Sequence, residues 1–219
     1  MKINILLPYK EKFDENKASS VSITVRNNLI YSKYLDQIKI YGQNVETPLF
    51  KNNFVGLRYS ILSFKSKNNF LAHEMLKIIN KDSDKNQLIE IHNRPYLIEQ
   101  ITKRNKFTVS LFLHNDPQTM NGSKSVEDRE NILQKCAAVF CVSKHVKQKF
   151  LEGILSHNNK VHILHNGVDR KIKTFPKKKK EILFVGRLVF EKGVDLYVDA
   201  VSNIAKKFPD WTFDLIGSF

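Results

Sequence analysis

Residues 182–194 read I-L-F-V-G-R-L-V-F-E-K-G-V, and this stretch says most about the fold of the chain. A short apolar strand, Ile182–Val185, runs into a glycine-containing turn, and a helix with an apolar stripe is expected directly after Gly193. A strand, a glycine turn and a helix in this order direct backbone N–H groups and the positive end of the helix dipole at one point. Arg187 and Lys192 add two positive charges there. The stretch therefore predicts a phosphate-binding turn in an α/β fold.

Short apolar runs alternate with longer stretches of helical spacing along the chain, which is the pattern of repeated βαβ units. Most of the runs are continuous, as expected for parallel strands that are buried on both faces. The predicted strands are Ile3–Leu7, Ile38–Tyr41, Leu88–Ile91, Thr108–Leu113, Val139–Val142, Val161–Leu164, Ile182–Val185 and Phe213–Ile216. The predicted helices are Ser20–Tyr34, Asn69–Asn80, Tyr96–Lys103, Val126–Lys135, Ser143–Leu155 and Val194–Phe208. We therefore expect an α/β fold with a Rossmann-like parallel sheet and helices on both faces.

The apolar pattern stops after Asn166-Gly167-Val168-Asp169 and resumes at Ile182. We expect a first Rossmann-like domain over residues 1–169, a linker over 170–181, and the first βαβ unit of an incomplete second Rossmann-like domain over 182–219. The run Lys177–Lys180 within the linker is interpreted as a solvated connector, with a specific binding role as the alternative. The segment Thr47–Lys67 is expected to be an irregular insertion or a short hairpin.

The composition limits the class of protein. The chain has 219 residues and a formal net charge of +14, which attracts polyanions such as nucleic acid, anionic lipid surfaces and phosphorylated substrates. A coding bias toward lysine is the alternative source of this charge, and the sequence contains no recognisable nucleic-acid-binding motif. No apolar run has the length of a membrane span, and the N-terminal run lacks the features of a signal peptide. Cys136 and Cys141 have no paired spacing, which favours reduced cytosolic thiols over a disulfide or a zinc site.

The segment from Gly186 to Asp195, G-R-L-V-F-E-K-G-V-D, resembles the signature of family 4 (group 1) glycosyltransferases of the GT-B fold. In that family two Rossmann-like domains face each other across a cleft, and this signature opens the C-terminal domain. The resemblance implies that Arg187 and Lys192, between Gly186 and Gly193, hold the diphosphate of a nucleotide sugar. The chemistry agrees, because departure of a nucleoside diphosphate builds negative charge that preorganised cations stabilise.

Further segments resemble the same family. His165-Asn166-Gly167-Val168-Asp169 resembles the N-G-V-D that closes its N-terminal domain, and Cys141-Val142-Ser143-Lys144 resembles its V-S segment, where Ser143 is expected only to cap a helix. Ile91-His92-Asn93-Arg94-Pro95 and Leu113-His114-Asn115-Asp116-Pro117 resemble sugar transferases of the lipopolysaccharide-core type. By that resemblance His114 is the catalytic candidate, near the donor sugar as a hydrogen-bonding or charge-stabilising group. The resemblance places His92, Asn115 and Asn166 in the cleft or near the acceptor.

His92 has a structural alternative, which is to pin its loop against the neighbouring strand. A metal site built from His92, His114, His162 and His165 is not favoured, because no pair has helical or finger-like spacing. We therefore expect no metal and no cofactor, with the nucleotide sugar acting as the donor substrate.

The sequence departs from the family pattern at two places. Where the family has a glycine pair after its first strand, this chain has Lys17-Ala18-Ser19-Ser20. Ser19 is expected to cap the first helix, with N–H groups that face a donor phosphate. The family's pair of glutamates, which binds the sugar and the ribose of the donor, has no counterpart here. The resemblance therefore covers the N-terminal domain and only the start of a truncated donor-binding domain.

The expected function is a retaining glycosyltransferase of the hexosyltransferase kind. It would move a sugar from a nucleotide-sugar donor to a cell-envelope glycan, either lipopolysaccharide or another lipid-linked acceptor. The alternative is a catalytically inactive fragment, or a subunit that needs a separate donor-binding chain. Binding of nucleic acid through bulk charge is a third hypothesis, which predicts strongly salt-dependent affinity, but we expect no nucleic-acid partner. The expected location is the cytoplasm, with peripheral contact to the anionic inner face of the cytoplasmic membrane.

Overall fold

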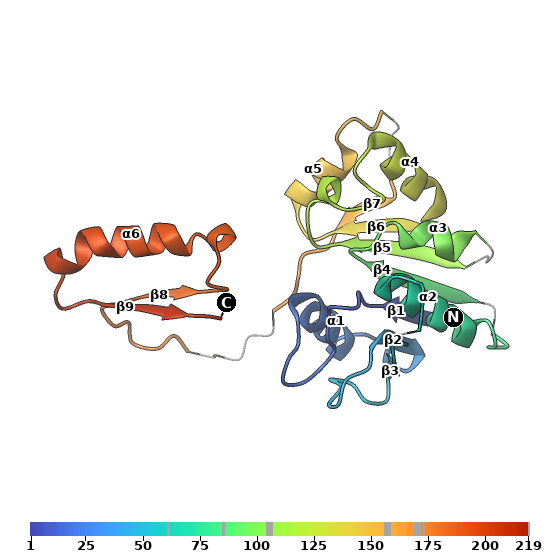
Figure 1. Cartoon of the computed structure of the whole chain (residues 1–219), viewed down its shortest axis with the longest axis horizontal. Helices are drawn as coiled ribbons and strands as arrows, with labels where there is room; N and C mark the ends of the chain where they lie inside the picture. Colours follow the sequence, from blue (N-terminus) through green and yellow to red (C-terminus); the bar gives the residue numbers. More distant parts are fainter. Residues whose placement is uncertain are drawn as a thin grey trace. The chain divides into compact units, whose positions relative to one another are not determined.

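The computed structural model describes residues 1–60, 62–84, 86–103, 107–155, 159–168, 172 and 174–218. The chain forms two compact units, Met1–Asp169 and Arg170–Phe219. The first unit contains a seven-stranded sheet, and the second contains a two-stranded sheet with a helix (Figure 1). The Asp of the N-G-V-D motif, at position 169, lies outside the described residues.

The sheet of the first unit is parallel throughout, with strand order β3-β2-β1-β4-β5-β6-β7. The chain runs outward from β1 to β3 and then starts again on the other side of β1 with β4. The neighbours β1 and β4 therefore form the topological switch point, where open α/β sheets bind ligands beyond the carboxyl ends of their strands. The strands are β1 Lys2–Leu6, β2 Ile38–Gln43, β3 Phe54–Leu57, β4 Gln87–His92, β5 Thr108–Leu113, β6 Ala138–Cys141 and β7 Val161–Ile163.

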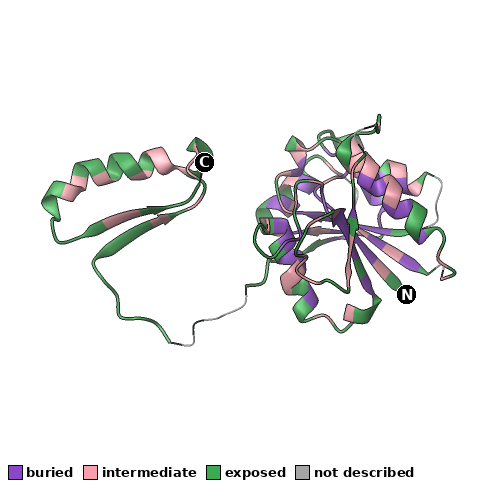
Figure 2. Ribbon diagram, turned by 60° about the horizontal axis from the view of Figure 1, so that its bottom comes forward, coloured by how far each residue is buried: buried purple, intermediate pink, exposed green. Residues whose placement is uncertain are grey.

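Helices cover both faces of this sheet, as predicted. On one face Val21, Val25 and Leu29 of α1 pack with Ile5 and Leu7, which come from β1 and the residue after it. On the other face the buried side chains of the remaining helices pack with Leu6 and with the apolar residues of β4, β5 and β6. Figure 2 colours the buried residues of the first unit purple, and they lie on the strands of the sheet and on the helices that cover it. The helices are α1 Ser20–Ile30, α2 Lys67–Ile79, α3 Leu97–Thr102, α4 Val126–Lys135 and α5 Lys144–Leu151, with short 3₁₀ turns η1 Leu35–Gln37 and η2 Pro117–Thr119.

A ladder of rings crosses four strands on the α1 side of the sheet. His92, Phe112, Phe140 and His162 are register partners on β4, β5, β6 and β7. Their ring centroids are 5.0, 4.6 and 5.7 Å apart in that order. Parallel strands bring register partners to the same face, so the in-register placement of four rings makes the ladder. This ladder holds the last residue of β4, His92, in a defined orientation.

Four elements differ by more than two residues from the sequence-based expectation, and one of them, the helix α6 Val194–Ile204, ends before the predicted Phe208. The segment Thr47–Lys67 contains β3, which pairs in parallel with β2, so the expected irregular insertion or hairpin is wrong for these residues. Gly56 interrupts the apolar run there, and a Cβ atom at this position would lie 2.5 Å from Oδ1 of Asn44, so a larger residue would displace the Asn44 side chain. The helix α1 ends at Ile30, before the predicted Tyr34. The helix α5 ends at Leu151, because Gly153 follows with a φ of +82° that a helix does not accept.

The second unit is a βαβ arrangement of β8 Glu181–Val185, α6 Val194–Ile204 and β9 Thr212–Ile216, with 3₁₀ turns η3 Phe190–Lys192 and η4 Ala205–Lys207. The two strands pair in parallel. The hydroxyl of Tyr197 in α6 lies 2.9 Å from the carbonyl oxygen of Ile182 and 3.1 Å from that of Asp214, which holds the helix on the sheet. No residue of β8, α6 or β9 is buried, because a single βαβ unit has too little apolar surface to enclose a core.

Candidate active site

Two histidines meet at the carboxyl ends of β4 and β5, on the α1 side of the sheet. Nδ1 of His92 lies 2.8 Å from Nε2 of His114, and the two rings stack with centroids 5.1 Å apart. On the far side of His92, Nε2 lies 2.7 Å from Oε1 of Glu90. His92 has no exposed surface, whereas His114 is half-buried. Glu90, His92 and His114 thus form a hydrogen-bonded chain that leads from inside the sheet to its edge.

The chemistry of the three groups defines the proton positions along this chain. A carboxylate only accepts hydrogen bonds, so Nε2–H of His92 donates to Glu90. When His92 is neutral, its Nδ1 accepts from Nε2–H of His114, and Nδ1 of His114 is then an unprotonated acceptor. When His92 is protonated, its Nδ1–H donates instead, and His114 carries its own proton on Nδ1. The protonation of His92 therefore determines whether Nδ1 of His114 is a hydrogen-bond acceptor or a donor.

The charge of His114 is also set by its surroundings. Burial, together with the neighbouring His92, lowers the pKa of His114 from 6.5 to about 3. A group with this pKa is neutral across the physiological range. His114 is therefore suited to exchange hydrogen bonds with a ligand and not to stabilise negative charge as a cation.

Asn93, which directly follows β4, fixes the backbone next to the two histidines. Its side-chain oxygen accepts a hydrogen bond from the N–H of His114 at 2.8 Å, and its own N–H donates to the carbonyl oxygen of Phe112 at 2.9 Å. Asn93 has a φ of +50°, the one positive value among the non-glycine residues that the structure describes. Asn tolerates this left-handed conformation better than most residues, because its short polar side chain can bond locally.

Ser19 lies at the start of α1, in the loop that follows β1. It is the N-cap residue, but its side chain makes no capping hydrogen bond and its Oγ lies 3.2 Å from Oγ of Ser22 instead. The first N–H groups of α1 consequently lack the capping side chain that the sequence predicts. Because β1 adjoins β4, this helix start and the histidine pair belong to the same edge of the sheet.

The other two cleft candidates, Asn115 and Asn166, are exposed at the same edge. Asn115 directly follows His114, after the end of β5. Asn166 lies in the segment after β7, and the next residue is held by a hydrogen bond of 3.1 Å from Nδ2 of Asn27 in α1 to the carbonyl oxygen of Gly167. The structure thus brings His92, His114 and Asn115 together and places Ser19 and Asn166 along the same edge.

The predicted phosphate turn lies in the second unit, between β8 and α6. Arg187 and Lys192 are exposed, and their side chains have no partner among the residues that the structure describes. Gly193 has a φ of +72° and serves as N-cap of α6, so a glycine is required there. Gly186 adopts an ordinary backbone conformation, and a Cβ atom there would meet its nearest neighbour, in Phe184, at 3.5 Å. The turn therefore presents two free cations beside the start of a helix.

Several residues at this edge of the sheet were not identified from the sequence, above all Glu90. Glu90 and His92 are two residues apart on one strand and therefore share a face. This spacing is the sequence signal that could have identified Glu90. Tyr9, Arg58 and Tyr59, which also lie past strand ends, carried no motif.

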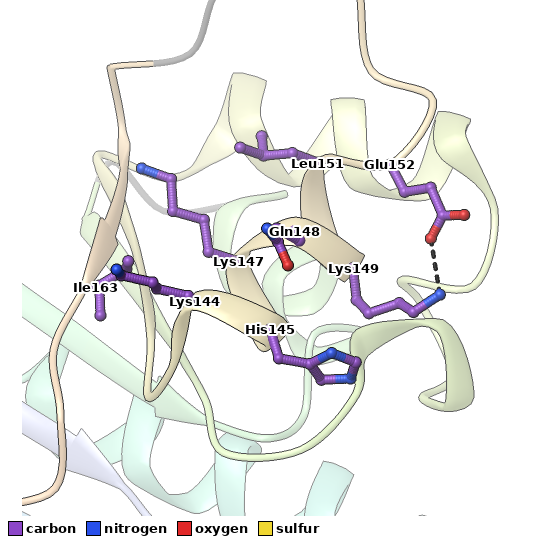
Figure 3. Close-up of a pocket in the computed structure, with 8 residues that line it drawn as sticks. All are labelled: Lys144, His145, Lys147, Gln148, Lys149, Leu151, Glu152 and Ile163. Carbon is purple, nitrogen blue, oxygen red and sulfur yellow. Dashed lines mark hydrogen bonds and ion pairs between the residues drawn. The ribbon is translucent and has the colours of Figure 1, made fainter.

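A cavity of about 670 Å³ lies along α5, away from the predicted residues (Figure 3). Two of its cations already have partners, because Lys149 pairs with Glu152 at 3.0 Å and Lys147 donates to the carbonyl oxygen of Val161 at 2.7 Å. The cavity therefore gives weaker support for a ligand than the sheet edge does. Among the described residues, no group of three or more His, Cys, Asp or Glu side chains is arranged to hold a metal ion, and no helix is long and apolar enough to span a membrane.

Comparisons with known proteins agree with this fold. Residues 166–218 match the family described as glycosyl transferases group 1. The uncharacterized glycosyltransferase MJ1178 of Methanocaldococcus jannaschii is 35% identical over 79 residues, which cover 36% of this chain and 20% of that protein. HepE of Anabaena, solved in complex with UDP-glucose, has a TM-score of 0.65 at 15% identity, over 100% of this chain and 61% of HepE. TarM has a TM-score of 0.50 at 16% identity, over 71% of this chain and 32% of TarM.

The chain spans only part of the length of each of these proteins. The structural matches share too little sequence to show more than the fold. The match of the family model, in contrast, includes the turn with Arg187 and Lys192. The chain therefore has the Rossmann-like α/β fold of these solved structures, and its residues 166–218 match the glycosyl transferases group 1 family.

Proposed function

We propose that the chain belongs to a retaining glycosyltransferase of family 4 that transfers a hexose from a nucleotide sugar to a cell-envelope glycan, either lipopolysaccharide or another lipid-linked acceptor. The observation that carries the proposal is the exposed pair Arg187 and Lys192, which has no side-chain partner in the described part of the chain and lies in a turn that matches the group 1 glycosyl transferases. The structural relative HepE was solved with UDP-glucose, and UDP-glucose is therefore the first donor to test.

In this reaction the bond between the anomeric carbon and the diphosphate oxygen breaks, and the electron pair leaves with the diphosphate. An acceptor hydroxyl oxygen bonds the same carbon from the same face, and its proton passes to the departing phosphate oxygen. Arg187 and Lys192 stabilise the charge that builds on the diphosphate, where fixed cations act most strongly. In the first unit, the uncapped start of α1 at Ser19 presents N–H groups of the kind that bind a phosphate.

His114 is proposed to contact the donor sugar. The lowered pKa supports a neutral imidazole that hydrogen-bonds a sugar hydroxyl, rather than one that stabilises charge. His92 has no exposed surface, so its part in the site is to position His114 and not to touch a ligand. Asn115 and Asn166 are exposed amides, able to bind hydroxyl groups on the acceptor side.

Peripheral contact with an anionic membrane is part of the proposal, together with a cytoplasmic location. The loop between β3 and α2 supports it, because Leu62 and Phe64 are 88% and 108% exposed between the cations Arg58 and Lys65. Exposed apolar side chains flanked by basic ones suit the interface of an anionic bilayer. In flotation with vesicles of phosphatidylglycerol and phosphatidylcholine, the double variant Leu62→Ser/Phe64→Ser should bind about tenfold less. Leu155→Ser is the matched control, because Leu155 is 95% exposed elsewhere.

Binding of UDP-glucose to the 219-residue chain tests the donor site. In an NMR titration the amides of residues 186–193 should shift, and Arg187→Gln should weaken binding about tenfold through loss of a charge-assisted phosphate contact. Lys207→Gln, an exposed lysine of the same unit, should change nothing. In a protein with transferase activity, Arg187→Ala should lower turnover by about 10²–10³-fold. Equal affinity of wild type and Arg187→Gln would remove the donor-site assignment.

A subunit that needs a separate donor-binding chain is the second candidate. The observation that favours it is the exposure of Leu183, Val185 and Leu215, apolar residues of β8 and β9. This candidate predicts no transfer from UDP-glucose by the isolated chain and recovery of transfer when a second polypeptide is added.

A further inference from the structure

A second cavity, of about 490 Å³, lies at the carboxyl ends of β1, β2 and β3. Its residues come from the loop after β1, from the ends of β2 and β3 and the residues that follow them, and from the first residue of α2. We call it the Tyr9–Tyr59 pocket. It is lined by Tyr9, Gln43, Asn44, Leu57, Arg58, Tyr59 and Lys67. No residue of this pocket belongs to the histidine pair or to the phosphate turn.

The aromatic walls of the pocket are held rigidly. The rings of Tyr9 and Tyr59 meet edge to face with centroids 6.0 Å apart, and Tyr59 packs in the same way on Phe70 of α2 at 5.1 Å. The N–H of Tyr9 donates to Oδ1 of Asn68 at 2.7 Å, and the hydroxyl of Tyr59 lies 3.1 Å from the carbonyl oxygen of Lys65. Side chains locked in this way lose little entropy when a ligand binds.

The polar lining of the pocket contains two positive charges and two neutral amides. The side chains of Gln43, Asn44 and Arg58 have no partner among the residues that the structure describes. Nζ of Lys67 lies 4.8 Å from the ring centroid of Tyr9 and 5.9 Å from that of Tyr59. The lining includes no acidic residue. The pocket thus combines two cations, two amides and two aromatic rings without an internal counter-ion.

Each of these groups matches one part of an acidic sugar. Aromatic rings pack against the apolar face of a pyranose, and amides both donate to and accept from hydroxyl groups. A guanidinium recognises a carboxylate or a phosphate through a planar pair of N–H donors. A neutral sugar would leave the guanidinium of Arg58 without a negatively charged partner, and an inorganic anion would leave the rings and amides unused.

We propose that the Tyr9–Tyr59 pocket binds an anionic sugar unit, a pyranose that carries a carboxylate or a phosphate. As the binding site of the acceptor glycan it rests on the proposed transferase function, but the binding itself does not. The pocket also lies at the base of the loop with Leu62 and Phe64, since Tyr59 is hydrogen-bonded to that loop through its hydroxyl. An acidic sugar linked to a lipid would therefore have its apolar part next to these exposed side chains.

The test is an NMR titration of the ¹⁵N-labelled 219-residue chain with five probes: glucuronate, glucose 6-phosphate, glucose, inorganic phosphate and UMP. The side-chain amide signals of Gln43 and Asn44 should shift with glucuronate or glucose 6-phosphate. The tighter of these two identifies the acid as a carboxylate or a phosphate. Glucose and inorganic phosphate should each bind about tenfold more weakly than that acid sugar, because each lacks half of the contacts.

Variants assign the binding to the pocket. Arg58→Gln should weaken the acid sugar about tenfold, whereas Lys51→Gln, an exposed lysine outside the pocket, should not. Arg58 is exposed, so this variant should keep the fold, which the unchanged spectrum of the core would verify. Arg187→Gln should leave this binding intact, so failure of the donor site and failure of the pocket are separable. The proposal is overturned if neither acid sugar shifts Gln43 and Asn44, if glucose or inorganic phosphate binds equally well, or if UMP binds more tightly.

Discussion

Nδ1 of His92 lies 2.8 Å from Nε2 of His114, and this contact links a fully buried ring at the end of β4 to a half-buried ring just past β5. Glu90 lies on the opposite side of His92 at 2.7 Å. The carboxylate therefore acts on His114 through one intervening ring. His92 has no exposed surface, and its hydrogen bonds determine which of the two ring nitrogens of His114 carries the proton.

Where both imidazoles are neutral in a sample at pH 8, we expect protons on Nε2 of His92 and on Nε2 of His114. The reason is that Glu90 can only accept, which leaves Nδ1 of His92 as the acceptor for His114. Long-range ¹H–¹⁵N correlation spectra distinguish protonated from unprotonated ring nitrogens. A proton found on Nδ1 of His114 at this pH would contradict the arrangement. His145, which is exposed, provides the reference signal of an unconstrained ring.

The stability of the fold should decrease as the pH falls from about 6.5 toward 3. The folded-state pKa of His114 is about 3, below its value of 6.5 in the unfolded chain, so the unfolded state binds more protons in this window. The contribution of His114 is complete above pH 6.5 and is lost as the pH falls. Denaturant unfolding should show a slope that His114→Gln reduces by at most about 1.4 kcal/mol per pH unit. A slope in His114→Gln equal to that of the wild type would refute the prediction.

Replacement of Arg129 should destabilise the first unit strongly. Its side chain is 2% exposed and donates to four carbonyl oxygens, those of Ser123, Lys124, Phe150 and Glu152, at 2.5–3.2 Å. In Arg129→Met these buried acceptors lose their donor, at a cost on the order of 3–5 kcal/mol. Chemical denaturation measures the loss. Arg58→Met, at an exposed arginine, should stay within about 0.5 kcal/mol of wild type, and a similar value for Arg129→Met would show that water replaces the guanidinium.

Gly217→Ala should disrupt the end of the β8–β9 pair. A Cβ atom at Gly217 would lie 1.8 Å from the carbonyl oxygen of Gly186, which no small adjustment relieves. The N–H of Gly186 bonds to the carbonyl oxygen of Ile216 at 3.0 Å, and the N–H of Leu188 bonds to that of Ser218 at the same distance. Hydrogen exchange at these two amides should accelerate in Gly217→Ala. Gly186→Ala meets its nearest neighbour at 3.5 Å and should retain slow exchange at Leu188.

The two cysteines should be inert in the native protein. Cys136 and Cys141 are 1% and 0% exposed, and burial raises the pKa of each thiol to about 12. Thiolate is the reactive form, so iodoacetamide at pH 8 should label neither residue until the chain is unfolded in denaturant. Mass spectrometry counts the added groups. Labelling of the native protein at the rate of a free thiol would show that the core around β6 opens readily.

Local sequence predicted the regular elements well where local signals are complete. The bounds of β5 and α4 coincide with those expected from the sequence. For α4 the reason is a capping box, in which the Ser125 side chain and the Asp128 side chain each bond the other's backbone N–H. The edge strand β3 was missed, because Gly56 interrupts its apolar run and its stability comes from pairing with β2. Its assignment depended on a neighbour that the local pattern does not reveal.

The candidate site was predictable only in part. The histidines past β4 and β5 follow strand ends, and parallel strands bring such residues to one edge. Their direct hydrogen bond and the complete burial of His92 depend on the register of β5 against β4. The spacing of apolar residues does not encode this register. No sequence motif indicated the Tyr9–Tyr59 pocket, because α1, β2 and β3 separate its two rings along the chain.

The sequence by itself determined that the chain is a parallel α/β protein and that the polar residues of the candidate site follow strand ends. It also determined that a glycine turn with Arg187 and Lys192 precedes a helix. These features follow from periodicity and from short motifs, which act over a few residues. The tertiary structure alone decided that Glu90 sets the state of His114 through His92, and that Tyr9 and Arg58 share one cavity. Contacts of this kind arise from strand order and register, which the packing of the whole domain determines.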